Sequence, residues 1–150
     1  HRDLHSFPTR RSSDLGGASW FFVGHVLYCT TLIVLFGISP TVLFFVIPLS
    51  LLYTFVNRKI GKLDYKNLTA GLLFYSIVES LSLALCAVYL IKGFSVSGLL
   101  LTIGFTLFYI SDMVLMHNYF GEKRRLISIL CHSTYYPAQI LIALSIMFLA

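Results

Sequence analysis

Four ionisable side chains interrupt apolar stretches of this chain: His25, Glu79, Asp112 and His132. Carboxyl and imidazole groups transfer protons in catalysis, so residues of these types could do acid–base chemistry. Ionisable residues in apolar membrane spans are costly to bury and by default mark functional sites. Asp112 is the hardest to explain as a structural residue, because a buried carboxylate needs a partner or a proton. We therefore predict that Asp112 is catalytic.

The composition places these stretches in a membrane. Apolar residues make up 57% of the 150 residues and charged residues only 11%, whereas soluble domains carry about a quarter charged residues. A chain with so little charge has no adequate polar coat for water. No basic stripe interleaved with aromatic residues is present, which argues against nucleic-acid binding. The three cysteines lie far apart and form no disulfide or C-x-x-C pattern.

Five stretches are long enough to cross a bilayer, which requires about 20 mainly apolar residues. They cover residues 17–38, 40–56, 68–91, 95–119 and 126–149. We predict an all-α integral membrane helical bundle with these five transmembrane helices.

The positive charges predict how the bundle is oriented. If the helices alternate in direction, one side of the membrane receives Arg58, Lys59, Lys62, Lys66, Lys123, Arg124 and Arg125, and the other receives only Lys92. Because positive loops stay in the cytoplasm, loops 57–67 and 120–125 are expected there and the C-terminus outside. We expect an integral protein of the bacterial inner (cytoplasmic) membrane.

This orientation brings the ionisable residues to similar depths. At a rise of about 1.5 Å per residue, His25 and Asp112 lie roughly 12 Å from the cytoplasmic boundary, His132 roughly 10 Å and Glu79 roughly 18 Å. We therefore predict that all four share one cavity in the cytoplasmic half of the membrane. The structural alternative is that the histidines and Glu79 only form hydrogen bonds between helices.

The first fifteen residues, HRDLHSFPTRRSSDL, are polar and aperiodic. They lack the apolar core and cleavage site of a signal peptide. They resemble the in-frame translation of a common short-read sequencing adapter. We therefore expect residues 1–15 to be non-native and residues 16–150 to be part of a transmembrane domain.

Three motifs occur in order along the rest of the chain: GGASWFFVGHVLY, GFTLFYISDMVL and STYYPAQILIALS. Together they resemble successive signatures of the YhhN family of membrane proteins, which includes the lysoplasmalogenases. The segment NRKIGKLDYKNLTAGLLFY is similar to the family's connection between them. The resemblance implies a bundle of eight helices, so we expect an N-terminal truncation. It also implies a second important aspartate, in a Gly-Asp motif, on a missing helix.

The implied reaction is hydrolysis of the vinyl-ether bond of a lysoplasmalogen, giving a fatty aldehyde and a glycerophospho head group. One carboxylic acid would protonate the β-carbon, and a second carboxylate would stabilise the oxocarbenium ion and guide water. Supporting or substrate-binding roles are predicted for His25, Tyr28, Glu79, Ser111, His132, Tyr135 and Gln139. The resemblance matches His25, Tyr135 and Gln139 to motif positions, whereas it leads us to expect an apolar stretch around Glu79. The expected partners are membrane lipids, with a lysophospholipid as substrate, and no metal or other cofactor is expected.

Two other readings of the sequence stay open. His25, His132 and Asp112 are residue types that bind zinc, as in a metal-dependent lipid amidase or esterase. A transporter or non-catalytic lipid-binding protein is the other alternative. It draws on a faint Gly-x-x-x-Phe repeat, Gly17 to Phe21 and Gly104 to Phe108, in two helices of opposite direction.

Overall fold

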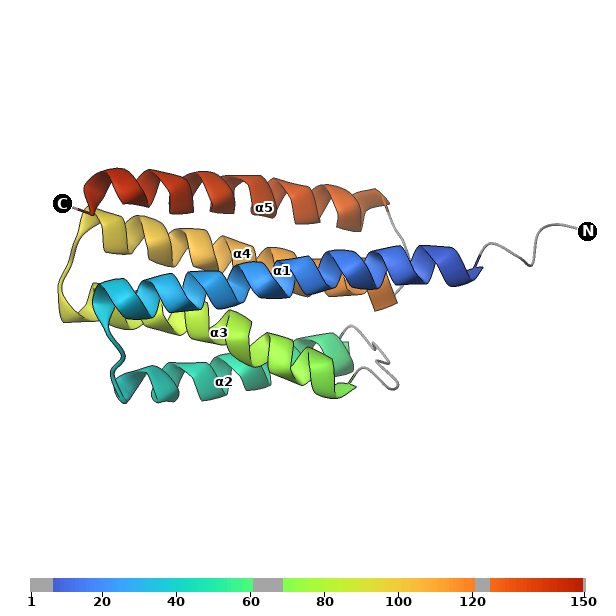
Figure 1. The fold of residues 1–150 in the computed structure, drawn as a ribbon, viewed down its shortest axis with the longest axis horizontal. Helices are drawn as coiled ribbons and strands as arrows, with labels where there is room; N and C mark the ends of the chain where they lie inside the picture. The colour runs from blue at the N-terminus through green and yellow to red at the C-terminus, as the bar shows by residue number, and fades with distance from the viewer. Residues whose placement is uncertain (1–6, 61–68, 121–124, 150) are drawn as a thin grey trace, which may run out of the picture.

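The computed structural model describes residues 7–60, 69–120 and 125–149, which form five long helices (Figure 1). These are α1 (Phe7–Phe36), α2 (Thr41–Phe55), α3 (Thr69–Lys92), α4 (Val96–Phe120) and α5 (Arg125–Ser145). A π-helical turn, η1 (Val56–Ile60), continues α2, and a 3-10 turn, η3 (Ile146–Phe148), continues α5. The described residues contain no strand, so the predicted all-α class is confirmed.

Five helical segments are long and apolar enough to cross a membrane, those of α2 and α5 being counted with the turns η1 and η3 that continue them. The prediction of a membrane helical bundle with five spans is therefore confirmed. Most observed boundaries lie within a few residues of the predicted ones, but α1 begins at Phe7 rather than at residue 17. Pro8 at the start of this extension is compatible with a first helical turn, where its missing N–H has no partner to lose. The non-native origin of residues 1–15 stays a prediction.

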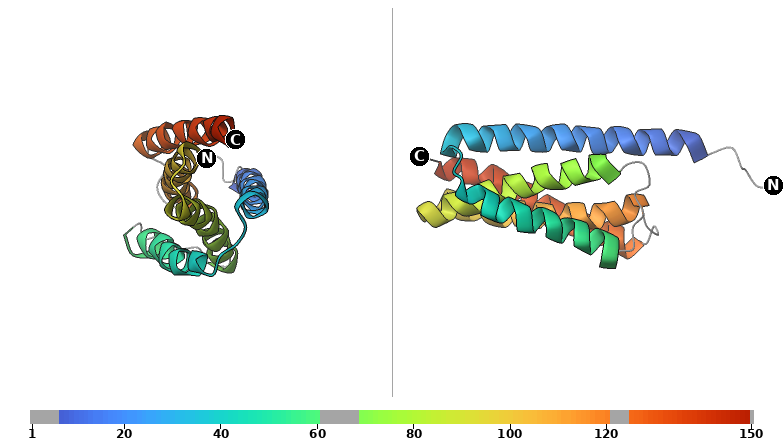
Figure 2. Two further views of the ribbon diagram at one scale, coloured as in Figure 1. Left: turned by 90° about the vertical axis from the view of Figure 1, so that its left-hand side faces the viewer. Right: turned by 90° about the horizontal axis from the view of Figure 1, so that it is seen from below.

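The end-on view shows how the helices are layered (Figure 2, left). α5, α4, α3 and α2 form a curved row, and α1 lies on one side of this row. α3 is the central element, since α1, α2 and α4 all pack against it, while α5 packs against α4. Three of the ionisable residues are thereby placed on helices that adjoin α3 or on α3 itself.

Successive helices alternate in direction (Figure 1). Consequently Arg58, Lys59 and Arg125 lie at the same end of the bundle, and Lys92 lies at the opposite end. This distribution agrees with the charge asymmetry that predicted the topology. The remaining basic residues of the predicted cytoplasmic loops, Lys62, Lys66, Lys123 and Arg124, lie outside the described residues.

Gly104 allows α4 and α5 to pack closely. A Cβ atom at this position would lie 2.8 Å from Ile142 Cγ1 and 3.2 Å from the backbone oxygen of Ala138. Ala138 is itself fully buried. Small residues at such contacts are the usual means by which membrane helices approach each other.

We expect Gly104→Leu to destabilise the bundle, because the added side chain has no space between α4 and α5. Overpacking of this kind typically costs about 1–3 kcal/mol. Thermal unfolding of the purified protein in detergent measures the effect. Gly71→Leu is the matched control, since a Cβ atom there meets nothing within 4 Å. Equal melting temperatures for the two variants would contradict the close α4–α5 contact.

Candidate active site

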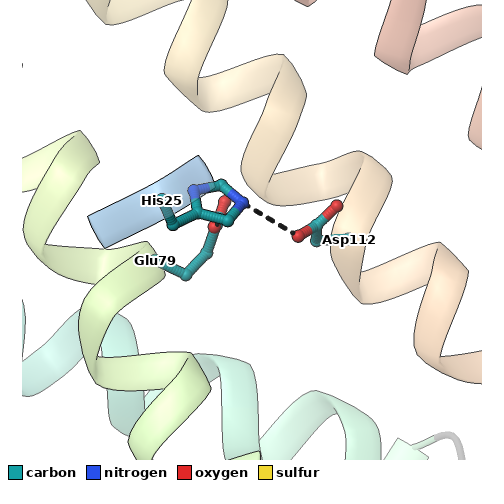
Figure 3. A group of neighbouring side chains, drawn as sticks. All are labelled: His25, Glu79 and Asp112. Carbon is teal, nitrogen blue, oxygen red and sulfur yellow. Dashed lines mark ion pairs between the residues drawn. The ribbon is translucent and has the colours of Figure 1, made fainter. Parts of the chain in front are cut away.

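Side chains from three helices converge inside the bundle: His25 from α1, Glu79 from α3 and Asp112 from α4 (Figure 3). His25 Nε2 lies 2.8 Å from Glu79 Oε2 and 3.3 Å from Asp112 Oδ2. We call these three residues the acidic cluster. His25 lies 54 positions before Glu79 in the sequence, and Glu79 lies 33 positions before Asp112. The cluster exists because α1 and α4 both pack against α3.

The acidic cluster is buried, and each of its side chains is only 1% exposed. His25 Nδ1, Glu79 Oε1 and Asp112 Oδ1 are buried without a hydrogen-bond partner among the described residues. If both carboxyls were ionised and the imidazole protonated, the cluster would carry one net negative charge. Burying an uncompensated charge costs several kcal/mol. The cluster therefore requires one further positive charge, either a proton or a cation.

Tyr75 completes the surroundings of Asp112. Its hydroxyl donates a hydrogen bond to Asp112 Oδ2. Tyr75 lies one helical turn before Glu79 on α3, so the same face of α3 supplies both side chains. Their i, i+4 spacing puts Tyr75 and Glu79 on one face of the helix, but no site role was predicted for Tyr75.

Aromatic rings fix the orientation of the His25 imidazole. The Phe108 ring lies 4.7 Å from it and the Tyr75 ring 5.7 Å from it, both nearly perpendicular to it. These edge-to-face contacts are the favoured geometry for neighbouring rings. They hold Nε2 toward the two carboxyls.

His132 is not part of the acidic cluster. Its side chain is exposed on α5, and its Nδ1 contacts the backbone oxygen of Ser128, one turn earlier, at 2.7 Å. The structure therefore brings together three of the four ionisable residues that the sequence predicted to share a cavity. His25 contacts both carboxyls, and Glu79, around which the family resemblance led us to expect an apolar stretch, is one of the two.

Ser111 precedes Asp112 in the sequence and is also buried. Its side chain contacts α5 and not the acidic cluster. Its hydroxyl donates a hydrogen bond to the backbone oxygen of Cys131 at 3.1 Å. This bond connects α4 to α5. The contact gives Ser111 a place in helix packing, and any supporting role in chemistry stays a prediction.

A cavity of about 280 Å³, open on one side, lies next to the acidic cluster between α1, α4 and α5. We call it the α1–α5 cavity. Tyr28, Tyr135 and Gln139, three of the predicted supporting residues, line it together with His25. The Tyr28 hydroxyl donates a hydrogen bond of 3.1 Å to Gln139 Oε1, which joins α1 to α5. His25 is the only member of the acidic cluster among the described residues that line this cavity.

The chain that forms this site is similar to a known family of proteins. The sequence profile of the YhhN family matches residues 5–146. The chain belongs to the YhhN family. The YhhN match includes the three helices that carry the acidic cluster, and it confirms the resemblance seen in the motifs. No curated protein and no solved structure gives a significant match.

Proposed function

We propose that this protein is a membrane-embedded hydrolase that cleaves the vinyl-ether bond of lysoplasmalogens. The observation that carries the proposal is the acidic cluster: two carboxyl groups and one imidazole in mutual contact, buried within membrane-spanning helices. Membership of the YhhN family is consistent with a lysoplasmalogenase-like role.

The reaction needs an acid and a base at one place. Protonation of the β-carbon of the vinyl ether converts the double bond into an oxocarbenium ion. Water then adds to the carbon attached to oxygen and releases its proton to a carboxylate. The resulting hemiacetal collapses to a fatty aldehyde and the free glycerol hydroxyl. The proton taken from the cluster is thus replaced by the proton that water gives up.

The charge-neutral form of the acidic cluster contains every group that these reaction steps require. It holds one carboxylic acid, one carboxylate and one imidazolium. Asp112 accepts a hydrogen bond from Tyr75 and pairs with His25, whereas Glu79 contacts His25. We therefore assign the role of proton donor to Glu79 and the role of cation-stabilising base to Asp112. His25, which lines the cavity, carries the proton between Glu79 and the lipid.

Glu79 takes the place of the second carboxyl that the family resemblance led us to expect on another helix. Glu79→Gln should therefore lower kcat for vinyl-ether cleavage by about 100-fold or more, because positioned acid–base groups contribute about 10²–10⁴-fold. Glu79→Asp should retain part of the activity. Steady-state aldehyde formation measures both variants. Wild-type activity in Glu79→Gln would exclude Glu79 as the acid.

The experiment that tests the proposed function is aldehyde release by the full-length protein in lipid vesicles. Two substrates are compared: a vinyl-ether lysophospholipid and its saturated alkyl-ether analogue of equal chain length. We expect aldehyde from the first and no product from the second, because only the vinyl ether has a carbon that can be protonated. Absence of aldehyde from both would overturn the proposal.

We propose that the acidic cluster lies in the cytoplasmic half of the membrane. We propose that the end carrying Arg58, Lys59 and Arg125 faces the cytoplasm of a bacterial cell. Substrate would then come from the cytoplasmic leaflet of the inner membrane.

One observation favours a second candidate, a metal-dependent lipid hydrolase. His25, Glu79 and Asp112 each offer one ligand atom, and the three atoms lie within 4.8 Å of one another. Ligand atoms around a tetrahedral zinc ion are separated by about 3.3 Å, and catalytic zinc sites use three protein ligands with one open position. A divalent ion would also supply the missing positive charge. In this arrangement Glu79 takes the place that the sequence gave to His132.

Metal analysis separates the two candidates. The proton-based mechanism predicts that protein purified without chelator contains less than stoichiometric zinc and keeps its activity in chelator. One zinc ion per chain that is lost in a His25→Ala variant, together with inactivation by chelator, would favour the metal-dependent hydrolase.

A further inference from the structure

The α1–α5 cavity lies between two helices that make few contacts with each other. Two of its walls, α1 and α5, do not pack extensively against each other. They are joined by the Tyr28–Gln139 hydrogen bond and by an edge-to-face contact of 5.9 Å between the rings of Phe21 and Tyr135. α4 forms the floor. The open side therefore lies between two membrane-spanning helices.

The rim of the opening on α1 is apolar. Trp20 lines the cavity and is largely exposed, and Leu27, two helical turns further along the same face of α1, is exposed as well. In a bilayer such surfaces contact lipid tails. The opening therefore adjoins a surface of α1 that is suited to lipid contact.

The lining combines aromatic rings with few polar groups. Phe21, Phe108 and Tyr135 contribute rings, and polar atoms come from His25 and from the Tyr28–Gln139 pair. Small-molecule sites are typically apolar and aromatic with a few convergent polar groups, and occupy about 300–1,000 Å³. At about 280 Å³ the cavity has room for a short part of one hydrocarbon chain.

We propose that the α1–α5 cavity binds one hydrocarbon chain of a membrane lipid, which enters sideways from the bilayer between α1 and α5. The part of the chain nearest the head group lies against His25, and the remainder extends through the opening into the bilayer. This inference rests on the proposed function, for which it specifies a single-chain lipid and its route to the acidic cluster.

Gly24 is the position that keeps this route open. It lies on α1 in the lining of the cavity, one residue before His25, and a Cβ atom there meets nothing within 4 Å. A larger side chain at Gly24 would thus occupy space in the cavity without displacing a neighbouring helix. Gly71 offers the same free space on an exposed part of α3, away from the cavity.

The proposal is tested by photo-crosslinking with a single-chain alkyl-ether lysophospholipid that carries a diazirine near the head-group end of its chain. This lipid has no vinyl ether, so labelling does not depend on cleavage. In full-length protein we expect labelling at cavity residues such as Phe21, Phe108 and Tyr135. In Gly24→Leu it should fall to the level seen with excess unlabelled lipid, whereas Gly71→Leu should label like the wild type.

Two outcomes would overturn the proposal. They are equal labelling of Gly24→Leu and Gly71→Leu, and labels confined to outward-facing residues such as Leu27 and Ile140. Labelled cavity residues without any vinyl-ether cleavage would instead uphold the lipid site and reject the proposed reaction.

Discussion

Asp112→Asn is expected to abolish vinyl-ether cleavage while the protein stays folded. Asparagine has the shape of aspartate and keeps a carbonyl oxygen that can accept the Tyr75 hydrogen bond. It removes the negative charge that would stabilise the oxocarbenium ion and take the proton from water. A loss of about 10²–10⁴-fold in kcat is expected from the removal of such a group. Aldehyde release per mole of folded protein measures it.

The result has to be separated from loss of structure. Removing one partner of a buried ion pair is often destabilising by about 3–5 kcal/mol, so the melting temperature of Asp112→Asn has to be determined beside its activity. A folded variant that is inactive supports the assignment. A folded variant with full activity would remove Asp112 from the mechanism.

His25→Asn and His132→Asn are expected to differ sharply. His25 contacts both carboxyls and lines the cavity, so its replacement interrupts the transfer of the proton and should lower kcat by about 100-fold or more. His132 is exposed on α5, and it contacts Ser128 and Tyr136 of its own helix. Its replacement should leave the activity unchanged.

The pair provides its own control, because both variants lose one histidine from a membrane-spanning helix. Activity assays in parallel, normalised to folded protein, are sufficient. Equal losses in the two variants would mean that the acidic cluster is not the active site, and loss in His132→Asn alone would place the chemistry on α5.

The helices of this protein were predictable because apolar length alone identifies them. The stretches around Glu79 and Asp112 stay apolar for a full bilayer crossing despite one charged residue each. The depth of His25 and Asp112 followed from counting residues along helices of known rise. Their common depth is what brings them into contact once α1 and α4 pack against α3.

The sequence did not predict which residues of α5 face the cavity. Successive residues of a helix are about 100° apart. His132, Tyr135, Tyr136 and Gln139, spaced i, i+3, i+4 and i+7, therefore fall within about 100° of α5 and form one stripe. Tyr135 and Gln139 line the cavity, while His132 and Tyr136 are exposed. The packing of α5 against α4 decides which residues of the stripe line the cavity and which are exposed.

Glu79 illustrates a second limit. The i, i+4 spacing of Tyr75 and Glu79 puts both on one face of α3, but the sequence does not show which helix packs against that face. Family resemblance pointed to an aspartate elsewhere and made Glu79 the doubtful residue. Its contact of 2.8 Å with His25 is a consequence of the central position of α3. Tyr75 was overlooked for the same reason, since its role depends on the approach of α4.

The central claim, that the acidic cluster protonates a vinyl ether, is tested most directly by running the reaction in D₂O. Protonation of the β-carbon predicts one deuterium on the carbon next to the carbonyl of the fatty aldehyde, detected by mass spectrometry of the product trapped as it forms. The label should appear with wild-type protein and be absent, together with the aldehyde, with Glu79→Gln. Release of a fatty acid in place of the aldehyde, or an aldehyde without deuterium at that carbon, would contradict the claim.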